Sequence, residues 1–383
     1  MKVLIVDISG KVLNYDIALC NAIHKENAAD IIFTAPSSMI SYFSFKTLKL
    51  LNLVPAKYKN TEAFWKKIVK ALEGVINYLI LIIYVFVNRK DVIHLQWLPF
   101  LEVFGIERYF LRMIKFVSPS SHLILTIHNV YPHNFSQLSK EKYRRRFQRV
   151  TRYVDSFIVH TNNTKENVAR EFGLEGCDIE VVHHGIFSTN DYVPLKWRGA
   201  PDGKWNLIMY GNQSYYKGTD VLVESLNYLP KEIKDDIKLT ICGDIQKTYY
   251  EQLKGIETGV EIKWIPSFVE SKELYSMIDR SDIILLPYRE ISQSGVLLLA
   301  LYFKRPIIAS DLPSFRETLF GFTNEMFCNA GDAQSLAQTI TNYVNGKVDI
   351  NKQLEMIDNL NLKYSWEESA RKTLNVYKKY YVS

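Results

Sequence analysis

The sequence predicts an α/β protein of two domains, each with a parallel β-sheet covered by helices. Three observations lead to this fold class. The 383 residues exceed the length at which one hydrophobic core usually divides. Short apolar runs alternate with helical patterns along the whole chain, which is typical of parallel sheets. A segment rich in Pro, Gly and Asp, 188–203, separates two such series, so we expect domains at 1–187 and 204–365 joined by this linker.

In the first half, six apolar runs predict strands and five stretches with helical spacing separate them. The predicted strands are Lys2–Ile8, Ile31–Thr34, Val92–Leu95, Leu123–Ile127, Ser156–Val159 and Glu180–Val182. The predicted helices lie near 16–25, 61–87, 107–116, 139–153 and 163–172.

One apolar run, Val75–Val87, has two possible interpretations, a membrane-spanning helix and a helix of the protein core. It is shorter than the ~20 residues that a spanning helix needs. Asn88-Arg89-Lys90 ends it, and a strand follows. We therefore expect a buried helix that crosses over the sheet.

The second half restarts the alternation of strands and helices. Its predicted strands are Asn206–Met209, Lys238–Cys242, Glu261–Ile265, Ile283–Leu286 and Ile307–Ala309, with helices between them.

The composition indicates a globular protein of a reducing compartment. Apolar residues make up 47% and charged residues 23%, which provides material for a core. The four cysteines are far apart and form no CxxC pair, so neither a zinc site nor a disulfide framework is predicted. Met1-Lys2 leads directly into an apolar strand instead of the apolar core of a signal peptide, and we expect a cytoplasmic protein.

Positive charge is concentrated in residues 40–152, which hold 19 Lys and Arg against 6 Asp and Glu. One cluster interleaves lysines with Phe64 and Trp65, and a second lies within Lys142–Arg152. A basic helix with an apolar face is typical of attachment to an anionic membrane surface. Nucleic acid is a rival partner, but no nucleic-acid motif accompanies the charge. A solvated helix face is the other alternative. The residues expected on the membrane side are Lys59, Lys66, Lys67, Lys70 and Trp65.

The segment after the strand Ile283–Leu286 predicts an anion site. Pro287 ends the strand, a polar loop follows, and an apolar helix begins at Ser294-Gly295. Free backbone N–H groups and the positive end of a helix dipole meet at such a junction. Small or polar loops also follow other strands, at Ser9-Gly10-Lys11, Gly211–Gly218 and Gly243-Asp244. No GxGxxG, P-loop, GxSxG or Asp-x-Asp motif occurs, so a dinucleotide fold and a carboxylate-held metal are not indicated.

The order of these landmarks resembles that of the family-4, or group 1, glycosyltransferases. Gly211–Gly218, Gly243 and the helix start at Ser294-Gly295 follow one another as the family's landmarks do. In the first half, Thr126-Ile127-His128 stands at the place of the family's Thr-x-His segment. The closing segment 366–383 resembles a final helix that crosses back to the first domain. The resemblance implies the GT-B fold, with two Rossmann-like domains facing each other across a cleft.

The resemblance also implies a reaction and its partners. It implies transfer of a sugar, a hexose in the simplest case, from a nucleotide-sugar to a glycan or polyprenyl-linked acceptor. We expect retention at the anomeric carbon, a role in polysaccharide synthesis of the O-antigen or capsule type, and no cofactor or metal. The location would be the inner face of the cell membrane, reached peripherally, and nucleic acid would not be a partner.

Site residues are carried over from the family only where this sequence matches it. The catalytic candidates are His128, Lys217 and Glu290. Lys217 would meet the diphosphate, and His128 would lie near the transferred sugar. The donor-binding candidates are Gly10, Gly211, Asn212, Lys217, Gly243, Ser292, Ser294, Gly295 and Val296.

The chain departs from the family pattern in two places. The family's Glu-x7-Glu pair would fall on Ile291 and Leu299, and Leu299 cannot accept hydrogen bonds from ribose. Glu290 could replace the first glutamate after a loop shift of one residue. Asn212 stands where the family has an arginine. Three alternatives therefore remain: a glycosyltransferase, a sugar-nucleotide epimerase of the same fold, and an inactive GT-B protein that only binds.

Overall fold

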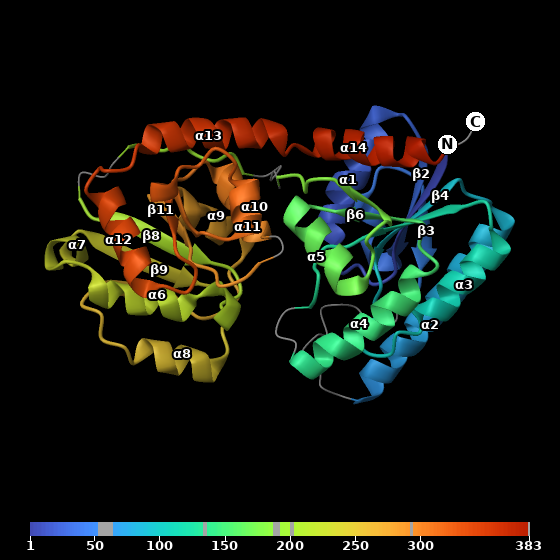
Figure 1. Cartoon of the computed structure of the whole chain (residues 1–383), viewed down its shortest axis with the longest axis horizontal. Coiled ribbons are helices and arrows are strands. Elements are labelled where there is room, and N and C mark those ends of the chain that lie inside the picture. Colours follow the sequence, from blue (N-terminus) through green and yellow to red (C-terminus); the bar gives the residue numbers. More distant parts are fainter. Residues whose placement is uncertain (53–63, 133–135, 187–191, 200–202, 292–293, 382–383) are drawn as a thin grey trace. The chain divides into compact units, whose positions relative to one another are not determined.

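The structure, a computed structural model, describes residues 1–52, 64–132, 136–186, 192–199, 203–291 and 294–381. The chain divides into two compact units (Figure 1). The first unit comprises Met1–Gly185 and Ser365–Ser383, and the second comprises Ile186–Tyr364. Each unit is an α/β domain with one parallel sheet, which confirms the predicted fold class.

The first unit is built on a seven-stranded parallel sheet of order β3-β2-β1-β4-β5-β6-β7. The order reverses between β1 and β4, which are neighbours in space, and Ile5 pairs with Phe33 on one side and with His94 on the other. The strands are β1 (Lys2–Asp7), β2 (Asp30–Pro36), β3 (Thr47–Leu50), β4 (Val92–Trp97), β5 (His122–Thr126), β6 (Ser156–Val159) and β7 (Asp178–Val181).

The helices that cover this sheet include the C-terminal helix of the chain. They are α1 (Leu13–Glu26), η1 (Ser37–Tyr42), α2 (Phe64–Val87), α3 (Glu107–Val117), α4 (Gln137–Thr151), α5 (Asn162–Phe172) and α14 (Trp366–Lys379). Figure 1 shows the red helix α14 beside the blue helix α1, and the two helices are in contact. Tyr377 bonds to His94 at 2.7 Å, and Ser369 Oγ donates to the His183 carbonyl at 2.6 Å. The C-terminal helix therefore belongs to the first unit.

Helix α2 connects β3 to β4, as the sequence predicts, but only one side of it is buried. Tyr78, Leu81 and Val85 are fully buried against the sheet. The opposite side carries exposed large apolar residues. The expectation of a buried crossover helix is therefore wrong for the outer side. By length and composition Ile68–Val87 could cross a membrane, and 39% of its most apolar window is buried in the protein.

The second unit is built on a six-stranded parallel sheet of order β10-β9-β8-β11-β12-β13. Its strands are β8 (Trp205–Tyr210), β9 (Ile237–Cys242), β10 (Glu261–Ile265), β11 (Ile283–Leu286), β12 (Ile307–Ser310) and β13 (Phe327–Cys328). Its helices are η3 (Tyr215–Lys217), α6 (Thr219–Ser225), η4 (Leu226–Tyr228), α7 (Lys231–Asp235), α8 (Lys247–Lys254), α9 (Ser271–Asp279), α10 (Gly295–Phe303), α11 (Pro313–Thr318), η5 (Asn324–Met326), α12 (Ala333–Val344) and α13 (Ile350–Lys363). Both sheets thus share the doubly wound strand order of Rossmann folds.

The described part of the predicted linker, 192–199 and 203, is tied to the second unit. Asp279 accepts from the Tyr192 hydroxyl at 2.5 Å and from the Leu195 N–H at 3.2 Å. Arg305, 1% exposed, donates to the Leu195 carbonyl and pairs with Asp279, each at 2.9 Å. A buried ion pair with further hydrogen bonds anchors the segment 192–199, which therefore belongs to the second unit.

Candidate active site

Each sheet has one point where the strand order reverses, and several of the predicted site residues follow the strands that flank these two points. In doubly wound folds the loops after the strands that flank this point form a crevice for ligands. In the first unit these strands are β1 and β4, and in the second unit β8 and β11. Gly10 follows β1, Gly211 follows β8, and Ser294 follows β11.

In the second unit, the loop after β8 passes so close to its neighbours that side chains would not fit. Gly211 has φ of +94°, and a Cβ there would lie 2.9 Å from Lys217 Nζ and 3.0 Å from Val296 Cγ2. A Cβ on Gly243 would lie 2.1 Å from the Gly211 carbonyl oxygen. The structure therefore brings the donor-binding candidates Gly211, Lys217, Gly243 and Val296 together, and Gly243 packs against the Gly211 loop.

Gln213 fixes this glycine loop, although no sequence motif reveals its role. The side chain is 3% exposed. Its Nε2 donates to the carbonyls of Gly211 at 2.7 Å and Cys242 at 3.1 Å, and its Oε1 accepts from Thr219 Oγ1 at 2.8 Å. The first contact closes the loop on itself, and the other two hold it to β9 and α6, so buried hydrogen bonds fix the loop that leads to Lys217.

Lys217 is a buried cation without a counter-charge. Its side chain is 5% exposed, and the Nζ atom lies 5.5 Å from the centroid of the Tyr288 ring. Among the described residues no carboxylate pairs with it and no hydrogen bond of Nζ occurs. Burial lowers the pKa of this ammonium to about 8. A charge held in this way is complementary to an anion that would enter the site.

The N-terminus of α10 lies beside Lys217 through the contact of Val296 with the glycine loop. Ser294 caps the helix, and its Oγ accepts from the Leu297 N–H at 3.1 Å. The N–H groups of Gly295 and Val296 have no partner within the helix, because the first turn of any helix leaves its donors free. Free donors, the helix dipole and the Lys217 ammonium together make this place favourable for phosphate.

A second cation, Arg289, ties the loop after β11 to the start of α6. Its guanidinium binds both carboxylate oxygens of Asp220, at 2.6 and 2.8 Å, and stacks 4.1 Å from the Tyr215 ring. Tyr249 Oη donates to Asp220 at 2.9 Å. Tyr215 is the first residue of the turn that contains Lys217. This network therefore fixes the loop after β8 relative to the loop after β11. Arg289 is thus committed to a structural pair.

Other predicted residues of the second unit are less clearly placed at this point. Glu290 is exposed, and no hydrogen bond or ion pair of it occurs in the described part of the chain. Asn212 is also exposed. Ser292 lies outside the described residues. Ile291 and Leu299 are half-buried against the core, so neither position of the family's glutamate pair offers a polar group here.

In the first unit, Asp7 shapes the loop that contains Gly10. Its carboxylate accepts from the N–H groups of Ser9 at 3.0 Å, Gly10 at 2.9 Å and Val12 at 3.2 Å. The N–H of Gly10 therefore already has a partner. Asp16, also fully buried, lies next to Asp7, and burial together with the Asp7 charge raises the pKa of Asp16 well above its usual range.

His128 follows β5 and belongs to a cluster of histidines around Tyr15. The Tyr15 ring lies 4.9 Å from that of His128, 5.3 Å from His160 and 4.9 Å from His184. His160 comes from the end of β6, and His184 follows β7. The sequence does not reveal this cluster, because the three histidines are far apart along the chain. Only the parallel sheet brings the ends of their strands together.

The hydrogen bonds of the cluster fix which nitrogen of His128 carries a proton. His160 Nδ1 lies 2.9 Å from the Val182 carbonyl oxygen, which only accepts, so Nδ1 carries the hydrogen. In the neutral ring Nε2 then accepts, and it lies 3.1 Å from His128 Nδ1. His128 therefore donates through Nδ1 and keeps a lone pair on Nε2. This Nε2 is buried without a hydrogen-bond partner among the described residues.

Burial keeps these histidines neutral at pH 7. It lowers the pKa of His128 well below its usual value, with His160, His184 and His94 adding to the effect and the nearby Gln96 carbonyl opposing it. It lowers the pKa of His160 to about 4 and that of His184 to about 3. A neutral His128 can accept a hydrogen bond from a hydroxyl group at Nε2.

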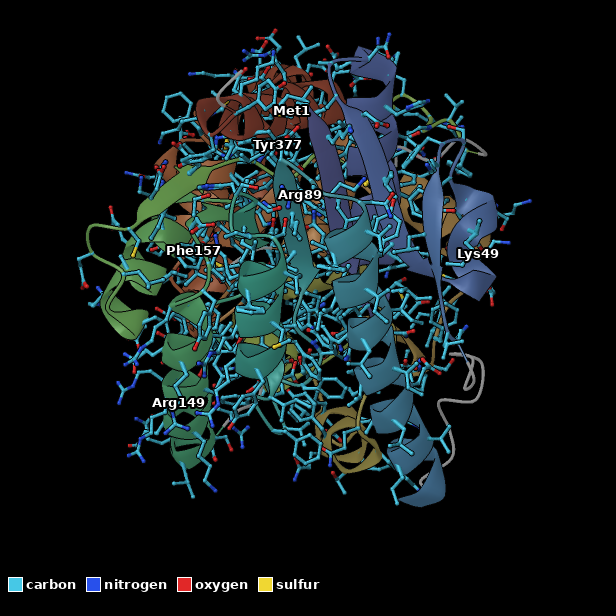
Figure 2. The ribbon with its side chains drawn as sticks, turned by 90° about the vertical axis from the view of Figure 1, so that its right-hand side faces the viewer. Met1, Lys49, Arg89, Arg149, Phe157 and Tyr377 are labelled. Atoms are coloured by element: carbon cyan, nitrogen blue, oxygen red, sulfur yellow. The ribbon has the colours of Figure 1, made fainter. Side chains whose placement is uncertain are left out.

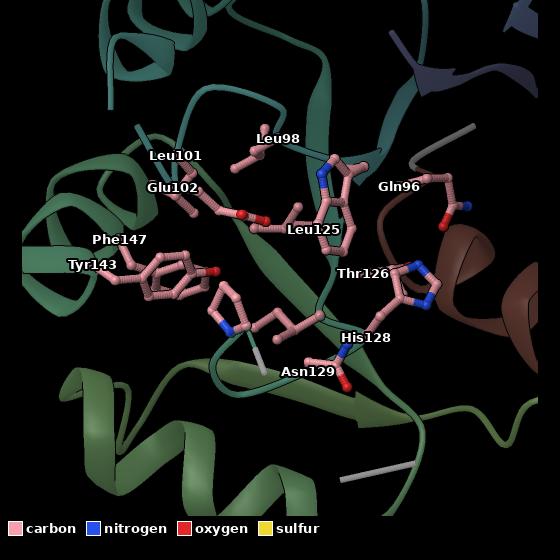
Figure 3. Close-up of a pocket in the computed structure, with 13 residues that line it drawn as sticks. Gln96, Leu98, Leu101, Glu102, Leu125, Thr126, His128, Asn129, Tyr143 and Phe147 are labelled. Atoms are coloured by element: carbon pink, nitrogen blue, oxygen red, sulfur yellow. The ribbon is translucent and has the colours of Figure 1, made fainter. Parts of the chain in front are cut away.

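His128 also lines a pocket of the first unit (Figure 3). Tyr143 and Phe147 of α4 form one side of it, and Thr126 and His128 form another. Leu98, Leu101 and Leu125 add apolar surface, and Glu102 and Asn129 add polar groups. Such a mixture suits a ligand with both apolar and hydroxyl-bearing parts.

The residues predicted to face a membrane are described only in part. Lys59 lies outside the described residues. Trp65, Lys66 and Lys67 belong to α2, but their side chains are not described. Lys70 pairs with the buried Glu73. In the described part of the chain, no group of three or more His, Cys, Asp or Glu that could hold a metal ion occurs.

Comparison with known families gives two adjoining matches. The model "Glycosyl transferases group 1" matches residues 196–361, and the model "Glycosyltransferase Family 4" matches residues 70–188. Together they cover both units and leave out only the N-terminal region, the C-terminal helix and a short gap.

Two similar curated proteins are known from other organisms. The chain is 22% identical over 243 residues to an uncharacterized glycosyltransferase of Methanocaldococcus jannaschii, covering 58% of this chain and 59% of that protein. It is 24% identical over 239 residues to a GDP-mannose:glycolipid 4-beta-D-mannosyltransferase of Xanthomonas campestris, covering 58% and 62%. The chain thus matches about 60% of the length of these relatives.

Solved structures resemble the whole chain. Anabaena HepE in complex with UDP-glucose has a TM-score of 0.66 at 14% identity, covering 99% of this chain and 100% of that one. Sucrose-phosphate synthase from Thermosynechococcus elongatus has a TM-score of 0.69 at 14% identity, covering 99% and 98%. At these identities the likeness establishes the fold, and it confirms the GT-B fold expected from the sequence.

Proposed function

We propose that this chain, which belongs to the group 1 glycosyltransferases of the GT-B fold, moves a sugar from a nucleotide-sugar to a glycan or lipid-linked acceptor. The second unit would bind the donor. The first unit, through His128 and its pocket, would bind hydroxyl groups of the sugar or of the acceptor.

The observation that carries this proposal is the unpaired, buried ammonium of Lys217 beside the start of α10. A nucleotide-sugar has a diphosphate with two negative charges. Placed there, it would pair with the Lys217 ammonium and accept hydrogen bonds from the N–H groups of Gly295 and Val296. The charge that costs stability in the free protein would then be compensated.

The same groups would also lower the barrier to transfer. The bond between the anomeric carbon and the diphosphate oxygen breaks, its electron pair stays on that oxygen, and a nucleoside diphosphate leaves. The oxygen of the acceptor hydroxyl forms the new bond to that carbon, and its proton passes to a phosphate oxygen of the leaving nucleoside diphosphate. Because negative charge grows on the leaving oxygen, Lys217 and the α10 donors would bind the transition state more tightly than the donor itself. We propose retention at the anomeric carbon, from the family resemblance alone.

The acceptor and the location are also part of the proposal. A lipid-linked acceptor is supported by one relative, which is named as acting on a glycolipid. We propose a hexosyl transfer in surface-polysaccharide synthesis, at the cytoplasmic face of the membrane, with no metal or cofactor in the transfer step.

A two-stage assay would test the function. Thermal unfolding with UDP-glucose, GDP-mannose and other nucleotide-sugars would identify the donor, since saturation at ~100 times the dissociation constant adds ~2.7 kcal/mol. Release of nucleoside diphosphate that depends on a lipid-linked acceptor would support a transferase. Conversion of the sugar without an acceptor would instead indicate an epimerase, and binding without any turnover would indicate an inactive protein.

A further inference from the structure

Helix α2 has an unusual distribution of residues between Ala71 and Val87. Glu73 and Asn77 point inward, at 1% and 0% exposure, and Asn77 exchanges two hydrogen bonds with the Leu51 backbone. A helix that faces water has its polar residues on the outside. Here the outer side carries only large apolar side chains at three- and four-residue spacing. These exposed residues are Leu72, Ile76, Leu79, Ile83 and Phe86.

Helix α3 continues this apolar surface. Leu111 and Ile114 are buried on its inner side, while Tyr109, Met113 and Phe116 are exposed on the other. The two helices pack side by side, and the Phe110 ring stacks on Tyr78 at 4.3 Å. Figure 2 shows α4, α3 and α2 side by side in one layer in front of the sheet. We call the exposed apolar residues of α2 and α3 the outer apolar face.

The exposed charged side chains around the outer apolar face are basic. Within the described residues of 64–132 and 136–152, every acidic side chain is buried or half-buried. Basic side chains are exposed, including Arg112 on α3 and Arg144, Arg145 and Arg149 on α4. Arg149 lies on the helix next to α3 in Figure 2. Water and anionic groups therefore meet an apolar surface with a basic border.

We propose that the outer apolar face enters the headgroup and upper acyl region of an anionic lipid bilayer, with α2 and α3 lying in the plane of the membrane. Apolar side chains bordered by lysine and arginine are complementary to anionic lipids. This inference rests on the proposed membrane location, and it identifies the surface through which the protein would attach to the membrane.

The same observations argue against other occupants. A second copy of the chain would bring the same basic border against itself, which is repulsive. Nucleic acid would match the basic border but would leave the apolar side chains in water. A spanning helix would have to move the buried Glu73 and Asn77, which pair with Lys70 and the Leu51 backbone, into lipid.

The test is co-sedimentation of the full chain with phosphatidylglycerol-containing vesicles. The variant carries Leu79→Gln, Ile83→Gln and Phe86→Gln, at side chains between 49% and 65% exposed. Each half-exposed side chain that leaves water is expected to contribute about fivefold to partition, so the three should contribute about a hundredfold. The control carries Phe268→Gln, Phe320→Gln and Leu362→Gln in the second unit, which are more exposed, between 69% and 79%.

The expected result is a loss of about a hundredfold in partition for the α2 variant and no change for the control. Equal partition of both variants would overturn the proposal. If the triple variant unfolds, Ile83→Gln alone should lower partition about fivefold, and no reduction would again overturn it. If charge alone held the protein on the vesicles, high salt would abolish the partition of the wild type and of both variants. This result would also contradict insertion.

Two further outcomes would overturn the in-plane arrangement. Dissociation of a dimer by the α2 substitutions, with vesicle partition unchanged, would assign the face to a second copy. Resistance of the wild type to alkaline carbonate extraction would indicate a spanning helix. Because the vesicles contain neither donor nor acceptor, failure of this test leaves the transferase assay unaffected. Vesicle binding without sugar transfer would contradict the proposed function alone.

Discussion

Replacing Lys217 with methionine should stabilise the free protein near neutral pH and weaken the binding of nucleotide-sugars. Burial lowers the pKa of Lys217 from 10.5 to about 8. A shift of this size corresponds to about 3 kcal/mol by which the folded state disfavours the charged form. The side chain is 5% exposed, so solvent screening reduces this figure little. Methionine has a similar length, fits beside the Tyr288 ring, and carries no charge.

The pH dependence follows from the direction of the shift. Because the unfolded chain binds the lysine proton more tightly than the folded one, wild-type stability rises as pH increases from about 8 to 10.5. Below pH 8 the folded protein bears the whole cost of the buried charge. The advantage of Lys217→Met should therefore be largest at pH 7, at most about 3 kcal/mol, and should fade towards pH 10.5.

For the donor, the loss of one charge-assisted contact of 1.5–3 kcal/mol predicts binding about 10- to 100-fold weaker. Thermal unfolding at several pH values and calorimetric titration with the nucleotide-sugar would measure both effects. Lys254→Met is a matched control, because Lys254 Nζ lies 5.7 Å from the Tyr250 ring but is exposed. An unchanged dissociation constant in folded Lys217→Met, or a loss of stability that is the same at every pH, would show that Lys217 is not a buried cation that binds the diphosphate.

Three other predictions concern separate parts of the molecule. His128→Ala should lower turnover more than tenfold while nucleotide affinity changes little; a fall in affinity with unchanged turnover per bound donor would make the histidine a binding residue. Burial and the Asp7 charge raise the pKa of the Asp16 carboxyl, which Asp16→Asn removes. In the wild type, the stability that depends on this carboxyl should be fully present below pH 3.8 and be lost as pH rises through the raised pKa. The variant should gain melting temperature relative to wild type over that range, and a constant difference would contradict this. Changing Lys59, Lys66, Lys67 and Lys70 to Glu should lower low-salt binding to anionic vesicles at least a hundredfold, since each basic residue contributes about 1 kcal/mol; binding independent of salt and of these changes would make this basic stretch an ordinary solvated face.

The sequence predicted most strands because a buried parallel strand is a short, continuous apolar run. The two strands it missed lack that signal. β3 (Thr47–Leu50) is an edge strand with alternating polar residues, and β13 (Phe327–Cys328) has two residues. Both exist through pairing with β2 and β12, which no local pattern reveals.

The site was predictable where a loop residue follows a strand and not where contacts come from distant segments. Lys217 and Ser294 stand in loops that a strand and a helix delimit. Gln213 and the Arg289–Asp220 pair act by joining loops 29 and 69 residues apart, and only the folded sheet brings these together.

Helix α2 shows the limit of periodicity as a guide to burial. Its apolar run predicts a helix, which the structure confirms, but apolar residues occupy both sides of it. With Leu81 inside and Ile83 outside, the pattern does not indicate which side faces the sheet. In the structure Asn77 lies on the inner side, where it bonds to the Leu51 backbone 26 residues away, a contact that the sequence does not reveal.

The most direct test of the account is to measure proton uptake when the donor binds. At pH 8 Lys217 should be about half protonated in the free protein. A diphosphate next to its ammonium should raise the pKa, so binding should take up about half a proton at pH 8 and none at pH 6.5. Calorimetric titration in two buffers of different ionisation enthalpy gives this number. We expect proton uptake in the wild type and in Lys254→Met, and none in Lys217→Met. Binding of the nucleotide-sugar with no proton uptake at pH 8, or with the same uptake in Lys217→Met, would contradict the placement of the diphosphate at Lys217.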